Sequence, residues 1–295
     1  MLMWSRALGA LRGTTTTSET WFAPVDSPFR DKFAAATNDG YNGFRSWRVW
    51  LQIGSQSVRR QYSRTTLGPW WNVIQEALFI VAVGFVWGPL FGTQPQGYVS
   101  YLAVGFIVFN LISALLSQAA STFIVVGGIA NRHATPLTSN ILEKIADSVI
   151  RFLHSAVIII ALIATGDFHF SSSSWVSLWV FCLLLLNAYL LSLWLGPLTV
   201  RFRDIEPSIH AVMRLMFFVT PVMWVPTALL GTSRSKILEL NPFYYFLDGI
   251  RNPLLGIALP NHEFAVLTLI TLFNAVAGIT IFTWTRSRIT YWGLQ

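Results

Sequence analysis

The sequence has 295 residues, of which 54% are hydrophobic and only 11% are charged. A soluble domain ordinarily carries about 25% charged residues, so this composition argues strongly against a soluble globular enzyme. It also excludes intrinsic disorder, which requires low hydrophobicity and high charge. The net charge of +7 therefore first raises the question of which side of a membrane the basic residues face.

The first part of the chain, residues 1–40, is expected to be a mobile cytoplasmic extension. It combines a run of threonines with scattered Pro and Gly, and its acidic and basic residues balance. Arg6 and Arg12 interrupt the apolar stretch near the start, so no cleavable signal peptide is predicted. We assign no function to this segment.

Residues 44–62 predict an amphipathic helix, because apolar residues recur every three or four positions and arginines and glutamines occupy the other face. A helix of this kind lies in the membrane interface. Arg59, Arg60 and Arg64 attract phosphate as readily as lipid headgroups. The helix is therefore either a simple anchor or a guide for an anionic substrate, and the sequence leaves both open.

The remainder, residues 41–295, predicts one all-α transmembrane domain. A helix crosses a bilayer core with about 20 mostly apolar residues, and no charged residue occurs between Ala77 and Asn131. Asp147 and Arg151, in the third span, are four residues apart on one helical face and can neutralise each other. The six predicted spans lie at about 71–91, 98–124, 145–165, 175–199, 209–230 and 264–285.

Basic residues set the orientation of the predicted spans, because cytoplasmic segments retain Lys and Arg. If both termini lie in the cytoplasm, only three basic residues lie on the outer side of the membrane, namely Arg234, Lys236 and Arg251. Glu76 lies early in the first span, where a headgroup or a partner chain can solvate it. Otherwise the spans lack charges away from their ends, which argues against ion-coupled transport with its intramembrane relay.

The loop after the fifth span, residues 225–262, alternates short apolar runs with Pro and Gly. None of these runs is long enough to cross, and such pieces enter a membrane only where they pack on protein or line a cavity. An ordinary folded extracellular loop is one interpretation. The second interpretation is that the loop forms short re-entrant helices at a pore mouth, and the aromatic group at 243–246 favours it.

Several kinds of chemistry are missing from the sequence. Lys32, Lys144 and Lys236 are followed by Phe or Ile, so no phosphate-binding Walker A loop exists. The five histidines show no metal-ligand spacing. We therefore predict no catalytic residue and no metal site, and the energy for active transport must come from another chain.

Four segments, in order along the chain, resemble the membrane-spanning subunit of bacterial ABC exporters of the type-2 permease group, particularly the O-antigen and teichoic-acid polysaccharide exporters. The resemblance extends from about Trp47 to the C-terminus. Its segments are 60–71 (RQYSRTTLGPWW), 151–154 (RFLH), 201–205 (RFRDI) with 220–224 (TPVMW), and 241–242 (NP) with 251–256 (RNPLLG).

The resemblance implies a multi-pass protein of the bacterial cytoplasmic (inner) membrane that is a transporter subunit and not an enzyme. Two such permease chains would work with two cytoplasmic ABC ATPase chains. ATP and Mg would be bound by the ATPase, so this chain would hold no cofactor. The implied substrate is a polysaccharide on undecaprenyl diphosphate, and nucleic acid is not an implied partner.

The resemblance also implies three groups of site residues. Those for ATPase coupling, in a loop at about 127–140, are Gly128, Asn131, Arg132, His133, Thr135 and Pro136. Those for entry of the lipid diphosphate are Arg59, Arg60 and Arg64. Those for the glycan channel and exit are Trp224, Phe243, Tyr244, Tyr245 and Arg251.

Two other functions remain open at this point. A type-2 exporter of a small lipid or drug would share the same topology, and only the polysaccharide motifs separate the two. A membrane-embedded transferase acting on lipid-linked sugar belongs to another class. For Trp224 and its aromatic neighbours, an interfacial aromatic belt is the alternative to glycan contact.

Overall fold

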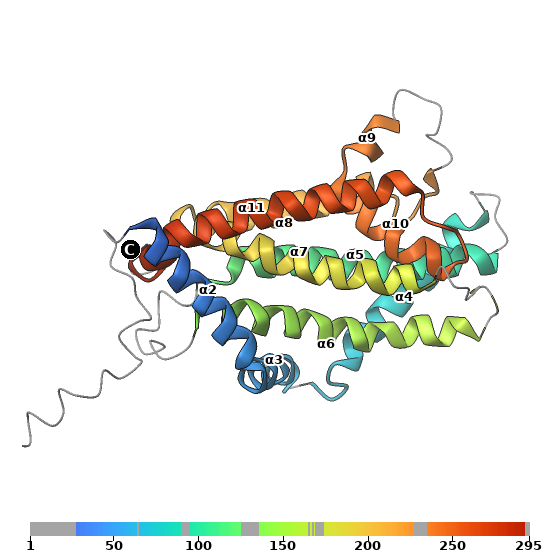
Figure 1. The fold of residues 1–295 in the computed structure, drawn as a ribbon. Helices are drawn as coiled ribbons and strands as arrows, with labels where there is room; N and C mark the ends of the chain where they lie inside the picture. The colour runs from blue at the N-terminus through green and yellow to red at the C-terminus, as the bar shows by residue number, and fades with distance from the viewer. Residues whose placement is uncertain are drawn as a thin grey trace, which may run out of the picture.

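A computed structural model describes residues 28–63, 65–89, 95–124, 136–164, 166, 168, 174–226 and 235–292. These residues form ten helices and no strand (Figure 1). The helices are α2 (Phe29–Arg45), α3 (Trp47–Tyr62), α4 (Trp70–Trp87), α5 (Pro95–Ser121), α6 (Leu137–Ile163), α7 (Ser174–Arg201), α8 (Ile205–Val219), α9 (Ser235–Glu239), α10 (Pro242–Leu254) and α11 (Asn261–Trp292).

Five of these helices, α4 to α7 and α11, are long and apolar enough to cross a membrane. The predicted all-α membrane fold is therefore confirmed. The fifth predicted span, 209–230, is helical only as far as Val219, within the 15-residue helix α8. Thr220 is extended, with ψ 138°, because the residue before a proline is disfavoured in the helical region and Pro221 follows. The count of six spans stays a prediction.

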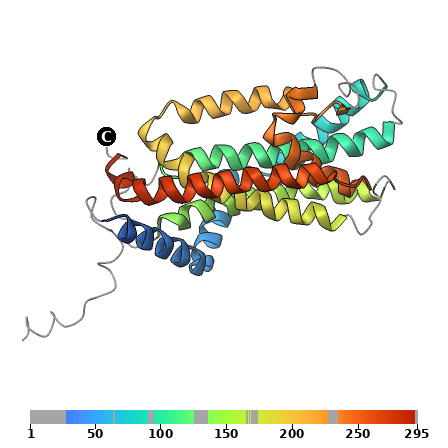
Figure 2. The ribbon, with the colours of Figure 1, turned by 45° about the horizontal axis from the view of Figure 1, so that its top comes forward.

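The long helices run side by side, with α5 and α7 in the middle of the bundle (Figure 1). The C-terminal part of α11 lies with α2 at one end of the bundle, and α10 lies toward the other end. We call these the α2 end and the α10 end. Helix α8 packs along α5, as the turned view shows (Figure 2).

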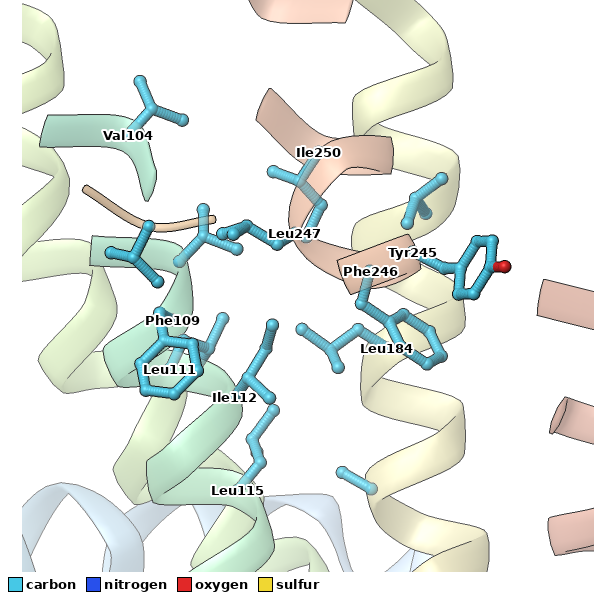
Figure 3. Close-up of a cluster of buried hydrophobic side chains, with 14 of the residues drawn as sticks. Val104, Phe109, Leu111, Ile112, Leu115, Leu184, Tyr245, Phe246, Leu247 and Ile250 are labelled. Carbon is cyan, nitrogen blue, oxygen red and sulfur yellow. The ribbon is translucent and has the colours of Figure 1, made fainter. Parts of the chain in front are cut away.

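The core forms where α10 inserts against α5 and α7. Leu247 and Ile250 of α10 point toward Val104 and Phe109 of α5 and Leu184 of α7 (Figure 3). All five side chains are buried. Between helices in a bilayer such contacts stabilise through van der Waals packing and not through removal from water, so close packing of these side chains holds α10 against the spans.

Helix α2 corrects one expectation. Residues 29–40, assigned to a mobile extension, belong to a helix that packs on α6 and α11. Sequence reasoning missed it because the helix is held by partners far along the chain and not by a strong apolar stripe of its own. Residues 1–27 lie outside the described residues.

Helix α3 confirms the predicted amphipathic helix, although it begins at Trp47 and not at residue 44. Gly54, Val58 and Tyr62, which the pattern places on the apolar face, are buried. Trp47 and Leu51 belong to the same pattern but remain exposed.

Candidate functional site

The C-terminal turn of α3 carries two exposed arginines, Arg59 and Arg60. Neither forms an ion pair with another described residue. Arg64, predicted to act with them, lies outside the described residues. The end of α3 is fixed in place because the Asn72 amide of α4 donates a hydrogen bond to the buried Tyr62 hydroxyl.

The ion pair predicted between Asp147 and Arg151 is confirmed. The guanidinium donates from Nε to Asp147 Oδ2 (3.0 Å) and from NH2 to Asp147 Oδ1 (2.9 Å). A third donor, NH1, bonds Gln61 of α3, and Gln118 of α5 donates to the same carboxylate (3.3 Å). The two charges therefore neutralise each other and link α3, α5 and α6.

A polar cavity of about 360 Å³ lies between α4 and α5. Its lining residues are Asn72, Gln75, Glu76 and Phe79 of α4 with Phe106 and Asn110 of α5. The α4 residues follow an i, i+3, i+4, i+7 spacing, which places them on one helical face. That spacing is a signal the sequence offers, and sequence reasoning singled out only Glu76.

The Glu76 carboxylate is half satisfied. Asn110 Nδ2 donates to its Oε1 (3.1 Å), and the Ser155 side chain of α6 also interacts with the carboxylate, whereas Oε2 is buried and has no partner at full hydrogen-bond geometry among the described residues. Beside it, the rings of Phe79 and Phe106 stack with centroids 4.4 Å apart. Phe217 of α8 meets both rings edge-on, so the cavity is polar on one side and aromatic on the other.

At the α10 end, Arg251 is completely buried. It forms an ion pair with Asp248, donates from NH1 to the Pro221 carbonyl oxygen (2.7 Å), and lies 3.8 Å from the centroid of the Tyr101 ring. Arg251 therefore joins α10 to α5 and to the segment after α8. Its side chain offers no surface to a glycan within this chain, and its predicted place at the exit stays a prediction.

The other predicted exit residues lie in or near α10 and make separate contacts. Tyr245 is buried and donates to the Glu239 carbonyl oxygen (2.9 Å), and Trp224 Nε1 donates to Phe218 O (3.0 Å). Tyr244 is partly exposed; burial, followed by the nearby carboxylate charges, raises the pKa of its hydroxyl, which therefore stays neutral.

Phe243 alone of these aromatic residues lines a second cavity, of about 490 Å³, between α5, α7, α10 and α11. This cavity is apolar over most of its wall. Its two asparagines bond each other, through Asn274 Nδ2 and Asn187 Oδ1 (3.0 Å), and Trp194 donates to Asn274 (3.2 Å).

Of the predicted coupling residues, Gly128, Asn131, Arg132, His133 and Thr135 lie outside the described residues. Pro136 is described and immediately precedes α6. It supplies no side-chain cap to that helix.

The missing cap of α6 comes from another helix. The Asp39 carboxylate of α2 accepts from the backbone N–H groups of Leu137 (3.2 Å) and Thr138 (3.0 Å). It also accepts from Arg286 of α11, at 3.0 Å from Nε and 2.7 Å from NH2. We call this group of contacts the Asp39 clasp.

The ABC-2 type transporter family matches residues 48–255, a range that runs from α3 through α10. The chain belongs to the ABC-2 type transporter family. Two O-antigen export system permease proteins, both named RfbA and both from Klebsiella pneumoniae, are each 22% identical to it. The alignments cover 234 and 235 residues, 78% of this chain and 89% of each relative.

The family and the apolar helices together make this chain a multi-pass membrane transporter subunit, as the resemblance predicted. Asp39 and Arg286 lie outside the residues that match the family. The exposed arginines of α3, the polar cavity and Arg251 lie inside them.

Proposed function

We propose that this ABC-2 permease is the transmembrane subunit of an ATP-driven exporter of a polysaccharide linked to undecaprenyl diphosphate. The glycan would be of O-antigen, teichoic-acid or cell-wall type and would cross the bacterial cytoplasmic membrane. Two permease chains would work with two cytoplasmic ATPase chains. The two RfbA relatives, which are O-antigen export permeases, support this substrate class.

One observation carries the proposal: α3 presents unpaired arginines beside a spanning helix that contains a polar and aromatic cavity. The guanidiniums of Arg59 and Arg60 form charge-assisted hydrogen bonds with phosphate oxygens. A diphosphate lipid keeps its tail in the bilayer and its charge at the interface, which is the level of an amphipathic helix. The Tyr62–Asn72 contact then places the start of the cavity next to the end of α3.

The other parts of the proposal concern orientation and the two ends of the path. Both termini would face the cytoplasm, and α8 with the residues after it would complete six spans. Residues 127–140 would contact the ATPase. Helices α9 and α10 would be re-entrant elements at the outer exit, where Phe243, Tyr244 and Trp224 would face the glycan.

A second candidate is an exporter of a small lipid or drug. The apolar cavity of about 490 Å³ favours it, because its asparagines are already bonded and its remaining wall suits hydrocarbon. A substrate of this kind would need no diphosphate and would be indifferent to the arginines of α3.

The experiment replaces Arg59 and Arg60 with Gln and measures polysaccharide on the cell surface. We expect export to fall about tenfold or more, because each lost charge-assisted bond is worth about 1.5–3 kcal/mol and about 1.4 kcal/mol is a tenfold change. The control is Arg48→Gln, on the exposed side of the same helix, which should export normally.

Deletion of the gene is the decisive companion measurement. If the deletion strain displays its full surface polysaccharide, the proposed function is wrong. Loss of drug or lipid efflux in that strain, with the polysaccharide intact, would favour the second candidate.

A further inference from the structure

We propose that the cavity between α4 and α5 binds the hydroxyl groups of a sugar, with the Glu76 carboxylate as the principal acceptor. The proposal rests on the proposed function and names the part of the substrate that this cavity contacts. Nothing in the family match assigns a role to these residues.

The carboxylate of Glu76 supports a ligand with donors. A buried acceptor without a partner is costly, and Oε2 is such an acceptor among the described residues. Its neighbours Asn72, Gln75 and Asn110 bring amide donors and acceptors to the same cavity. Hydroxyl groups both donate and accept, so a polyol satisfies this mixture, whereas a hydrocarbon chain leaves it unpaired.

The aromatic side of the cavity supports a sugar over water alone. The stacked rings of Phe79 and Phe106 give a flat apolar wall, and Phe217 braces them edge-on. A pyranose presents C–H groups on its faces and hydroxyl groups at its rim, which matches a wall of rings opposite amides and a carboxylate.

The charge of the lining argues against two other ligands. No Lys or Arg is among the described residues that line the cavity, so the Glu76 carboxylate would repel a diphosphate. Three or more His, Cys, Asp or Glu side chains do not gather as metal ligands anywhere in the described ranges. The diphosphate would therefore stay at the arginines of α3 while the sugar enters the cavity.

The test uses the complete exporter in cells and measures surface polysaccharide for each assembled complex. Glu76→Gln keeps the size of the side chain and removes the charge, and Asn110→Leu removes the amide that orients it. We expect export per complex to fall about tenfold in Glu76→Gln and further in the double variant. The control is Phe85→Leu, on an exposed position of α4, which should export as the wild type does.

Two results would overturn this assignment. One is normal export per complex in both cavity variants. The other is a loss of assembled permease dimer with unchanged export per dimer, which would show that the second subunit fills the cavity. The proposed function fails separately, when deletion of the whole gene leaves surface polysaccharide unchanged.

A second inference comes from the other end of the bundle. We infer that the Asp39 clasp makes α2, α3 and the start of α6 one rigid body, so that the arginines of α3 move together with α6. Asp39 is only 1% exposed, and it receives donors from α6 and α11 at once.

Close backbone approach extends the contact from α2 into α3. A Cβ on Gly43 would lie 2.1 Å from Thr138 Oγ1, and one on Gly54 would lie 2.9 Å from the Glu143 carbonyl oxygen. Between them, the hydroxyls of Ser46 and Ser139 are 3.0 Å apart. The first turns of α6 therefore touch both helices with no space for one to slide past the other.

This arrangement gives α6 a defined role in the proposed cycle. Its first turn, residues 137–140, is the end of the segment expected to contact the ATPase, and α3 carries the arginines at the proposed entrance. Displacement of the start of α6 would move that entrance directly, without a hinge between the two helices.

A disulfide across the contact tests the rigid body. The variant carries Ser46→Cys and Ser139→Cys with Cys182→Ser, and its bond is formed by oxidation and verified on a non-reducing gel. We expect the cross-linked exporter to transport as well as the reduced one. If cross-linking stops export and a reductant restores it, α3 and α6 must separate during transport and the inference is wrong.

Discussion

Each end of the bundle is held by a buried arginine, and the two arginines reach partners at very different distances along the chain. At the α10 end, Arg251 pairs with Asp248, three residues earlier in the same helix. At the α2 end, Arg286 pairs with Asp39, 247 residues away. The first contact can form with its helix, whereas the second forms only when the whole fold is complete.

Both arginines differ from the charges placed at the proposed substrate path. Arg59 and Arg60 have no ion-pair partner among the described residues, and one Glu76 oxygen has no partner at full hydrogen-bond geometry there. A buried ion pair broken on one side leaves an uncompensated charge, so paired charges serve the fold. Unpaired ones are available to a ligand.

The largest expected effect on stability is that of Asp39→Ala. The change leaves Arg286 without its carboxylate, a loss of about 3–5 kcal/mol, and it removes the cap of α6, worth about 0.5–2 kcal/mol. Thermal unfolding of the purified permease in detergent measures the loss. Asp31→Ala, an exposed position on the same helix, should change stability by less than about 0.5 kcal/mol, and equal losses in the two variants would contradict this account.

Arg251→Met should cost about 3 kcal/mol, because Asp248 is left buried without its partner. The effect should be local, since the pair lies within one helix. Hydrogen exchange is expected to speed up in α10 and at 220–226 while α2 and α6 keep their protection. Uniform acceleration over the whole chain would show that this pair is not a local contact.

The smallest of the three effects is expected for Gly43→Ala, which tests the close approach of α2 to α6. The added methyl overlaps the Thr138 hydroxyl, and overpacking of this kind costs about 1–3 kcal/mol. The matched control is Gly97→Ala, where an added Cβ meets no atom within 4 Å. A stable Gly43→Ala variant would show that the two helices can shift apart at little cost.

Local sequence patterns predicted the features that local physics controls. The spacing of four residues predicted the Asp147–Arg151 pair, and the apolar periodicity predicted α3. The charge rule for loops assigned Arg251 to the outer side without indicating its burial, which Asp248 one turn earlier allows by neutralising it. The fifth predicted span contains Pro221, and α8 ends at Val219, two residues before this proline.

Contacts between distant segments were beyond the sequence. Nothing near Asp39 signals Arg286, because the pair depends on α2, α6 and α11 meeting at one end of the bundle. The α4 half of the polar cavity could be predicted from the sequence, because the spacing places Asn72, Gln75 and Glu76 on one face of that helix. Its other half, with Asn110 and Phe106, follows only from the packing of α5 on α4.

Photo-cross-linking tests the central claim most directly, that the polar face of α4 contacts the lipid-linked glycan. A benzophenone amino acid replaces Phe79 in the cavity or, as the control, the exposed Phe85 of the same helix. The complete exporter is then illuminated in cells during export. The account predicts a glycan-positive adduct of the permease from position 79 and little from position 85. No adduct at position 79, or equal adducts at both positions, would contradict it.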